Sequence, residues 1–470
     1  MSASPVAERR TFDPLTEAIR LAAAAVVVLA GLLAGGGASA TAPPNEAAKL
    51  VPSTALVYLH VSTDGDRPAT ARAGDLAERF PSWPALRRSI LRRLEAPGCR
   101  AATEAIRTAD EAALVLFDIG AARTANSLVL VDTGKDQPRP QQRRCGALTA
   151  EYVGRFLAIG QPESLAVARR LQRGQGNALA DSADYRKAMD TLPAARVADG
   201  YASADGIRRL LAPQGGLLGA AGTLVDQPAL RSAGFSVTAQ DDLAKLRIHS
   251  LLDEDVAKRT RTFPPFDPTL ADVVPEGAMA YVGVANLGTA LQRVLSAAGE
   301  GQDALQPLLG GLDASLLRLF RGESAVIITP NVPAPVLTLV ARTEDEAAAR
   351  RSLARLPAAL RKVFKSAVRD GKVVVSTAQS GVDAVLDDDA PKLADTDAFS
   401  SVTGGKGDGK VTSLVFLDFN RLLRLGEQTG LYDSRAYVRV KDDLDKVRAV
   451  GAVSSGSSSE STAEISLLIP

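Results

Sequence analysis

The sequence predicts an α+β fold in which two homologous halves each pack helices on a mainly antiparallel sheet. Three observations lead to this prediction. The stretch 50–62, LVPSTALVYLHVS, recurs at 273–285 as VVPEGAMAYVGVA, with identities at one constant offset. Strand-like runs come in pairs rather than in strict alternation with helices, which favours α+β over a doubly wound parallel fold. Each copy ends in two strand-like runs that a short turn joins, and such hairpins are antiparallel.

The duplication is supported by further matches in the same order. Similar short runs begin at Glu111 and Glu323, Ser127 and Val336, Arg155 and Lys372, Asp181 and Asp395, and Ser250 and Ser466. The period is far longer than that of a solenoid repeat, so we interpret it as one unit used twice. This interpretation predicts a first half at 50–253, a linker at 254–272 and a second half at 273–470.

The first half is expected to open with a strand in which apolar and β-branched residues alternate between two faces. A helical region at 71–94 follows, with a break near Pro81 and Pro84. Later elements are predicted from the period of their apolar residues. They are strands at 111–118, 126–133, 152–159 and 200–203, helices at 163–171, 184–189 and 205–211, and a closing hairpin of 235–238 and 245–252.

The second half is expected to repeat this order. A strand begins at Ala278, helices follow within 287–320, and strands begin at Ser324 and Val336. A long helix is predicted at 344–364, because Thr343-Glu-Asp-Glu is a typical N-terminal signal. A hairpin of 447–454 and 463–469 closes the chain. The linker segment combines charges of both signs with three prolines, which is typical of a connector.

The N-terminal 40 residues have the layout of a secretory signal. A polar, arginine-containing stretch precedes an uncharged apolar run, and Ala38-Ser39-Ala40 fits a cleavage site. Two alternatives stay open: an uncleaved membrane anchor formed by Leu21 to Ala40, and export by a twin-arginine route. Each interpretation predicts that the residues after a short spacer at 41–49 are extracytoplasmic, either secreted or held in the cell envelope.

Cysteine usage agrees with an exported chain. The sequence holds two cysteines, Cys99 and Cys145. In an oxidising compartment two thiols most often pair, and a disulfide between them would contribute up to about 4 kcal/mol by loop entropy. Two unpaired thiols are the alternative. A metal site is disfavoured, because no His or further Cys residues cluster nearby in the sequence.

Composition argues against some classes of function. The formal net charge is +1, whereas dedicated nucleic-acid binders usually carry a marked basic excess. Aromatic residues make up 4% of the chain, too few for a stacking platform that binds single strands or sugars. The basic, amphipathic region 71–94 fits either a membrane-surface helix or, more simply, a surface helix with solvated arginines.

Sequence motifs give no sign of catalysis. HExxH, CxxC and G-x-S-x-G do not occur, and the two histidines are His60 and His249. His60 shares a strand face with Tyr58, and its counterpart in the second copy is Gly283. His249 is expected to be solvated on a strand face with Lys245 and Arg247. We therefore predict no catalytic, cofactor-binding or metal-binding residue and no bound cofactor.

Two short segments resemble ligand-binding loops without meeting their requirements. Gly404 to Lys410 contains Gly-x4-Gly-Lys, but a phosphate loop needs Ser or Thr next and a helix behind it, whereas Val411 and a strand follow. The acidic run Asp387-Asp388-Asp389 lacks the glycine and the terminal Glu of a calcium loop. We interpret both segments as solvated loops.

The chain resembles an uncharacterised bacterial family that is catalogued as a domain of unknown function (number 3352). The resemblance rests on LVPSTALVYLHVSTD at 50–64, RFPSWPALR at 79–87, GRFLAIG at 154–160 and LADSADYR at 179–186. It extends over most of residues 50–470. It implies an exported or membrane-tethered protein and no known activity, so no site residues can be transferred.

Two classes of function follow. We favour a non-catalytic envelope protein that binds a ligand, a lipid or a protein, with its site in a groove between the halves. The alternative is an envelope hydrolase whose Ser/Lys or paired-carboxylate site leaves no sequence signature. A pocket that holds a carboxylate or lysine of strongly perturbed pKa would favour the enzyme. A purely structural protein would have no sizeable pocket.

Overall fold

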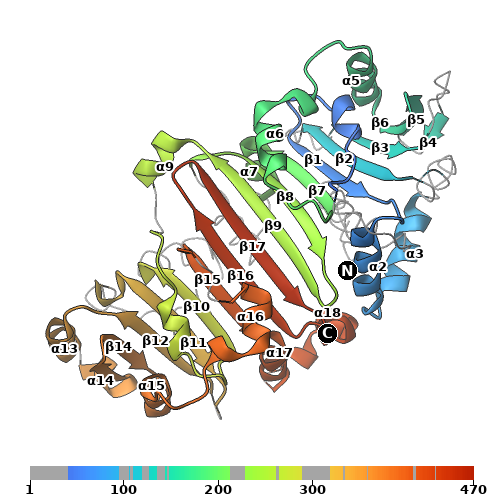
Figure 1. Cartoon of the computed structure of the whole chain (residues 1–470). Coiled ribbons are helices and arrows are strands. Elements are labelled where there is room, and N and C mark those ends of the chain that lie inside the picture. Colours follow the sequence, from blue (N-terminus) through green and yellow to red (C-terminus); the bar gives the residue numbers. More distant parts are fainter. Residues whose placement is uncertain are drawn as a thin grey trace, which may run out of the picture.

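The computed structural model describes residues 41–94, 105, 109–118, 126–134, 143–145, 148–211, 228–260, 264–287, 318–331, 334–356, 358–405, 409–428 and 430–470. Within these ranges the chain folds as α+β, with helices on both faces of one large sheet (Figure 1). Neighbouring strands of this sheet run antiparallel. The prediction of an α+β fold with helices packed on a mainly antiparallel sheet is therefore confirmed.

The strands are β1 (Val57–Ser62), β2 (Glu111–Asp118), β3 (Asn126–Asp132), β4 (Arg143–Cys145), β5 (Leu148–Val153), β6 (Phe156–Gly160), β7 (Arg196–Ser203), β8 (Leu230–Ala239), β9 (Leu243–Leu252), β10 (Ala280–Ala285), β11 (Glu323–Thr329), β12 (Val336–Arg342), β13 (Lys365–Arg369), β14 (Lys372–Ser376), β15 (Ser413–Asp418), β16 (Ala449–Gly456) and β17 (Glu460–Leu468). From edge to edge the order is β4-β5-β6-β3-β2-β1-β7-β8-β9-β17-β16-β15-β10-β11-β12-β14-β13.

The strand order is the same on both sides of the centre. Read outward, it is β9-β8-β7-β1-β2-β3-β6-β5 on one side and β17-β16-β15-β10-β11-β12-β14-β13 on the other. Strands β1 and β10, which carry the recurring stretches, hold corresponding places. Isolated bridges also correspond, since one joins Pro52 to Ala178 and another joins Pro275 to Lys392. We call the two sides the first and the second half.

The α-helices are α2 (Pro68–Glu78), α3 (Trp83–Leu94), α5 (Pro162–Gln172), α6 (Ala183–Asp190), α7 (Ala204–Leu211), α9 (Glu254–Thr260), α13 (Glu346–Ala354), α14 (Ala358–Val363), α15 (Gln379–Leu386), α16 (Asp397–Thr403), α17 (Phe419–Gln428) and α18 (Arg435–Leu444). Short 3-10 turns are η1 (Ala47–Leu50), η2 (Leu179–Asp181), η3 (Thr269–Val273), η5 (Arg318–Phe320), η6 (Leu393–Asp395) and η7 (Leu431–Asp433).

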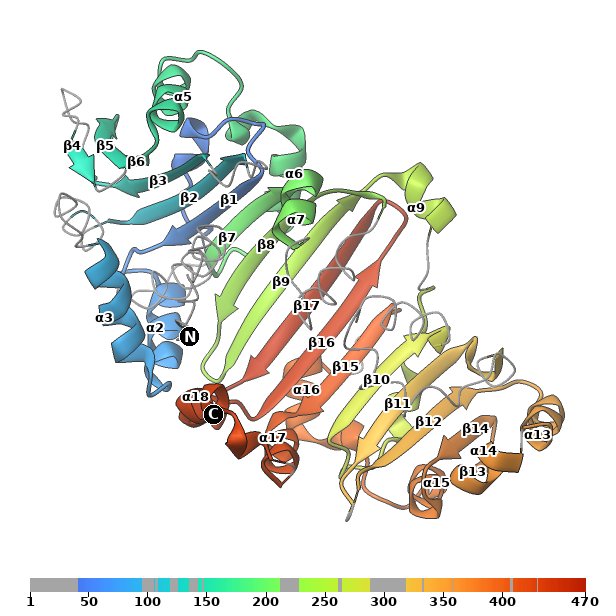
Figure 2. The ribbon, with the colours of Figure 1, turned by 180° about the vertical axis from the view of Figure 1, so that it is seen from behind.

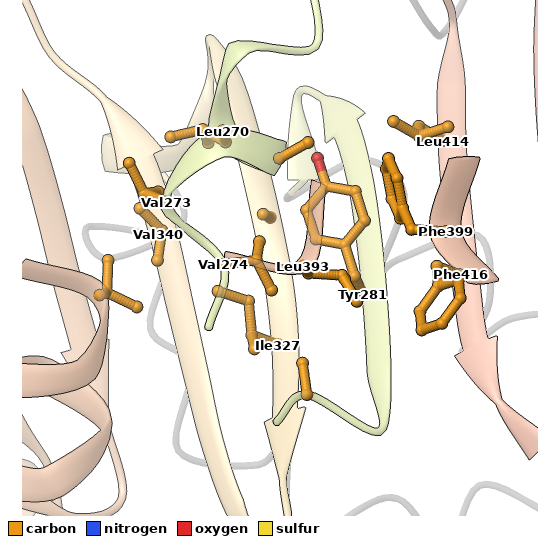
Figure 3. Close-up of a cluster of buried hydrophobic side chains, with 14 of the residues drawn as sticks. Leu270, Val273, Val274, Tyr281, Ile327, Val340, Leu393, Phe399, Leu414 and Phe416 are labelled. Carbon is orange, nitrogen blue, oxygen red and sulfur yellow. The ribbon is translucent and has the colours of Figure 1, made fainter. Parts of the chain in front are cut away.

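One face of the sheet carries the largest cores. In the first half, η1, α5 and α6 pack there around Tyr58. In the second half, η3, α15 and α16 pack around Tyr281, and Figure 3 shows this ring beside Phe399 and Phe416. Phe399 is fully buried and meets Tyr281 edge-on at a centroid distance of 6.4 Å. Each half therefore has a core of its own on this face.

The opposite face, seen in Figure 2, is covered in parts by other helices. Helix α7 packs against Val57 and Leu116, and α13 packs against Leu339 and Val373. Successive strand residues point to opposite faces, so β1 gives Tyr58 to one core and Val57 to the other. This explains why the central strands lack a clean alternation of apolar and polar residues.

The halves meet along an unbroken ladder between β9 and β17, which runs from Leu243 opposite Leu468 to Leu251 opposite Glu460. Cross-strand ion pairs lie on this seam. Glu464 contacts Lys245 Nζ at 2.9 Å and Arg247 Nη2 at 2.7 Å. The two halves thus form one continuous sheet.

His249 lies on the same seam, and the expectation that it is solvated is wrong. Its exposed fraction is 5%. Its Nδ1 lies 3.1 Å from Thr462 Oγ1, and its Nε2 lies 3.6 Å from Glu460 Oε2. Lys187 of α6 forms an ion pair with the same Glu460 at 2.6 Å. Because β9 is flanked by β8 and β17, its side chains have neighbours on both sides.

Three predicted elements differ in their extent. The strand expected at 152–159 is two strands, β5 and β6, because Gly154 adopts a positive φ of 60° and turns the chain. The helix expected at 344–364 is divided into α13 and α14, and Pro357 lies between them in the sequence. The expected linker contains α9 and η3.

Several predictions concern residues outside the described ranges. Cys99 is one of them, and the side chain of Cys145 is not described either, so the disulfide stays a prediction. The signal or anchor at 1–40 also lies outside. Among the residues that the structure describes, no helix is long and apolar enough to span a bilayer.

Candidate functional site: a buried charged cluster and a polar pocket

Four charged side chains form a buried cluster in the first half, which we call the His60 cluster. Its members are His60, Glu111, Arg196 and Asp199. His60 and Asp199 are fully buried, Glu111 is 1% exposed and Arg196 is 7% exposed. Charged groups are seldom buried to this degree unless they pair with one another, so their mutual contacts decide whether the cluster is stable.

Strand register brings these side chains together. Strand β1 lies between β2 and β7, and His60 is directly opposite Asp199 of β7. Glu111, the first residue of β2, is opposite Ser62 and thus lies one step further along the same face. His60 Nδ1 is 3.2 Å from Asp199 Oδ2, and His60 Nε2 is 3.8 Å from Glu111 Oε1. Arg196 Nε donates to the same Asp199 oxygen at 2.8 Å.

Residues 45–47, which lie within the expected spacer and reach the first residue of η1, close the cluster. Asn45 Nδ2 donates to Asp199 Oδ1 and to the Tyr185 hydroxyl, both at 3.1 Å, and Tyr58 donates its hydroxyl proton to Asn45 Oδ1. The backbone N–H groups of Glu46 and Ala47 donate to Glu111 at 3.2 and 2.6 Å. This segment therefore contacts the core directly.

The surroundings shift the pKa values of the cluster in opposite directions. Burial would lower the pKa of His60, but the charge and hydrogen bond of Asp199 and the charge of Glu111 outweigh it, so that pKa is raised. Burial would raise the pKa of Asp199, yet His60 and Arg196 together lower it. Burial raises the pKa of Glu111, although His60 and two backbone N–H groups oppose the shift. The cluster therefore favours a His60 cation beside an ionised Asp199.

The second half contains a glutamate contact like that of Glu111 but has no counterpart of the His60–Asp199 pair. Glu323 opens β11 as Glu111 opens β2, and it accepts hydrogen bonds from Leu270 N and Thr269 Oγ1, both at 2.6 Å. The positions of His60 and Asp199, however, are taken by Gly283 and Leu414. A Cβ atom on Gly283 would lie 2.5 Å from the Tyr281 hydroxyl. The glutamate contact to a 3-10 turn is thus common to both halves, and the charged pair is specific to the first.

Burial limits what the His60 cluster can do chemically. His60 Nε2 and Ser62 Oγ are both buried and have no hydrogen-bond partner among the residues that the structure describes, so no Ser–His hydrogen bond forms between them. A nucleophile–base pair would need such a contact and a path for substrate. In the described structure the cluster instead keeps His60 and Asp199 charged inside the first half. The stability of the fold therefore depends on whether His60 is protonated.

The cluster predicts a pH-dependent stability. The pKa of His60 is raised in the folded state. Its contribution to the free energy of unfolding is therefore complete below its pKa in the unfolded chain, about 6.5, and is lost as pH rises through its pKa in the folded protein. We expect the free energy of unfolding of the wild type to fall relative to that of His60→Gln as pH increases from about 6. Urea unfolding across pH 6–9 measures this difference.

His249→Gln provides a control with the opposite sign. Burial lowers the pKa of His249, so its contribution to stability is complete above the unfolded value of about 6.5 and is lost as pH falls through the folded value. Removing His249 should therefore steepen the fall in stability with rising pH below about pH 7 and leave it unchanged at higher pH. Identical pH profiles for the wild type and His60→Gln would contradict the proposed protonation of His60.

A solvent-accessible pocket lies in the second half, at the ends of strands β10, β15 and β16. Its volume is about 440 Å³, and seven of its twelve lining residues are charged: Glu276, Lys392, Asp395, Asp397, Asp418, Arg421 and Arg448. The walls come from the turn before β10, from η6 and the start of α16, and from the start of α17. The volume is within the range of about 300–1,000 Å³ that is usual for small-molecule sites.

Two cations of the pocket are held by the protein itself. Arg421 Nε lies 3.3 Å from Asp418 Oδ2, and Arg421 Nη1 donates to the Glu276 carbonyl at 3.2 Å. Lys392 donates to the carbonyl of Asp387. Within the described part of the chain, the Arg448 guanidinium and the carboxylates of Glu276, Asp395 and Asp397 form no hydrogen bond or ion pair. These four groups remain for a ligand.

The sequence indicated some of these features and missed others. It placed His60 on the Tyr58 face, and the two rings are stacked at 6.5 Å. It gave no role to Asp199, although a lone carboxylate in the apolar run 197–202 is a signal for a buried partner. Arg448 has no comparable signal, because the pocket joins residues that are far apart in the chain. The acidic run Asp387-Asp388-Asp389 is exposed, as expected.

Comparisons with known proteins add little. No protein-family model and no curated protein matches the chain. Among solved structures, crystal form I of TP0453 aligns at 11% identity over 47% of this chain and 88% of that one, with a TM-score of 0.27. Crystal form IV of TP0453 aligns at 12% identity over 43% and 79%, with a TM-score of 0.24. Likenesses of this size support no conclusion. Among the described residues, no group of three or more His, Cys, Asp or Glu side chains could hold a metal ion.

Proposed function

We propose that the chain is an extracytoplasmic, non-catalytic binding module of the cell envelope. The observation that carries the proposal is the open pocket of about 440 Å³, where the Arg448 guanidinium and the carboxylates of three acidic residues have no partner among the described residues. Polar groups that are prearranged around a cavity favour recognition of a ligand. We place the ligand in this pocket of the second half rather than in a groove between the halves, because an unbroken ladder joins them.

The proposal also takes the two halves as copies of one duplicated unit and the chain as a relative of the family that is catalogued as a domain of unknown function (number 3352). The common strand order and the corresponding Glu111 and Glu323 contacts support duplication. Divergence at His60 and Asp199 in one half, and in the pocket of the other, then represents specialisation of each copy. Export rests on the signal-like residues 1–40, with Leu21 to Ala40 as the possible tether.

An envelope hydrolase is the alternative function. The paired carboxylates Glu111 and Asp199, with His60 between them, are the observation that favours it. Both carboxylates are 1% exposed or less, however, and a substrate would need a path that the described residues close. The hydrolase would be supported if Asp199→Asn abolished turnover of an envelope substrate by a protein that remained folded.

Native mass spectrometry of the protein purified from its own envelope tests the proposal. We expect a mass that begins at Thr41, is lower by two hydrogens because Cys99 and Cys145 are joined, and carries a small bound molecule. Cys99→Ser is the control, since it should abolish the loss of hydrogens and keep the bound molecule. A mass that retains Met1 and carries no adduct would contradict signal cleavage and small-molecule binding, and would point to protein partners.

A further inference from the structure

The pocket of the second half has a counterpart position in the first half, and the difference between them indicates the ligand. In the second half, Asp418 of β15 is opposite Ala449 of β16, and in the first half, Ser203 of β7 is opposite Ser232 of β8. Arg448 comes directly before Ala449, and Arg231 comes directly before Ser232. The two arginines therefore hold corresponding positions. Arg231 is neutralised within the protein, because its Nη2 lies 2.8 Å and 3.0 Å from the two oxygens of Asp184.

Arg448 has no such carboxylate partner among the described residues of the second half. Asp184 is the second residue of α6, after the N-cap Ser182. The second residue of α16, after the N-cap Thr396, is Ala398. The acidic side chain is shifted by one position to Asp397, which lines the pocket without pairing with Arg448. The arginine at this position is therefore neutralised by a carboxylate of the protein in the first half, whereas in the second half it faces the pocket without pairing with Asp397.

The unpaired groups of the pocket have both signs and come from different walls. Arg448 precedes β16, Glu276 lies in the turn before β10, and Asp395 and Asp397 lie at η6 and the start of α16. A simple anion would be repelled by the three carboxylates, and a simple cation would be repelled by Arg448. A ligand that carries one charge of each sign satisfies both sets. Leu393 and Phe416 add an apolar part to the lining.

We propose that the pocket binds a short zwitterionic peptide, whose carboxylate pairs with Arg448 and whose ammonium group pairs with the carboxylates of Glu276, Asp395 and Asp397. An arginine fork suits a terminal carboxylate, and hydrogen bonds to charged groups are about twice as strong as neutral ones. This inference rests on the proposed binding function and specifies its ligand class.

Four forms of one tripeptide test the charges separately. Isothermal titration would compare free trialanine, its N-acetyl form, its C-terminal amide and the doubly blocked form. We expect free trialanine to bind, and each blocked end to weaken binding about tenfold, as loss of one charged hydrogen-bonded contact implies. Equal binding of the N-acetyl form or of the amide would overturn the proposal, because the site would then recognise an anion or a cation alone. Failure of all four forms to bind would overturn it as well.

Two substitutions locate the site. Arg448→Gln should weaken trialanine binding about tenfold and leave binding of the C-terminal amide unchanged. Arg231→Gln is the matched control in the first half and should change neither. Both arginines are exposed, so thermal unfolding of the variants should match that of the wild type. If Arg448→Gln and Arg231→Gln weakened trialanine binding equally, the assignment of the carboxylate contact to Arg448 would be contradicted.

The bound peptide should be recovered intact by mass spectrometry after incubation. Hydrolysed trialanine would refute the non-catalytic function while the ligand class still held. Intact trialanine that does not distinguish Arg448→Gln from the wild type would refute the ligand site while the binding function still held.

Discussion

Asp199→Asn is expected to lower the free energy of unfolding by about 3–5 kcal/mol, the cost of leaving a buried charge without its partner. Asp199 is fully buried and accepts from Arg196 and Asn45 while it faces His60 at 3.2 Å. The substitution keeps the shape of the side chain but leaves two buried cations without this carboxylate. Chemical denaturation would measure the loss as a lower midpoint with an unchanged slope.

Asp184→Asn serves as the control for this prediction. It also removes a carboxylate that contacts an arginine, but the Asp184–Arg231 pair is partly exposed and should contribute less than about 1 kcal/mol. Adding His60→Gln to Asp199→Asn should cost less than His60→Gln costs alone, because the two side chains interact. Similar midpoints for Asp199→Asn and Asp184→Asn would show that the His60 cluster contributes little to stability.

Phe399→Ala is expected to destabilise the second half by about 3–5 kcal/mol, the usual cost of removing a buried aromatic ring. Phe399 contacts Tyr281 and lies 5.7 Å from the ring of Phe416 (Figure 3). It also fixes α16, whose first residues line the pocket. We therefore expect weaker trialanine binding in this variant, even under conditions in which it remains folded.

Phe399→Leu is the matched variant, since it keeps most of the apolar volume. It should cost less than the alanine variant and retain binding. Denaturation and titration of the same preparations separate the two effects. A stable Phe399→Ala protein with unchanged binding would show that the α16 wall does not depend on this ring.

The fold was predictable because its signals are local. Apolar periodicity identified the closing hairpins β8–β9 and β16–β17, and the recurrence of Val51-Pro52 as Val274-Pro275 identified β1 and β10 as corresponding strands. Register along a single strand also placed Tyr58 and His60 on one face. The errors occurred where a turn depends on one residue, as at Gly154, whose positive φ divides the run 152–159 into two strands.

The functional regions were less predictable because they depend on pairing between distant strands. Asp199 meets His60 only because β7 joins β1 in one particular register. Arg448 joins the pocket only because β16 and α17 begin at the same end of the sheet as the turn that holds Glu276. The burial of His249 likewise follows from β17, which is more than two hundred residues away in the sequence and lies beside β9.

The seam between β9 and β17 joins the two halves of this chain as an antiparallel contact between edge strands joins two subunits of a dimer. A chain ending at Leu252 would expose a ten-residue edge strand, with its free N–H and C=O groups available for pairing. Such an edge can pair antiparallel with its own copy, and the contact is then isologous. Isolated first halves should therefore self-associate through β9, whereas the intact chain satisfies that edge internally and keeps its two unlike halves in a one-to-one ratio.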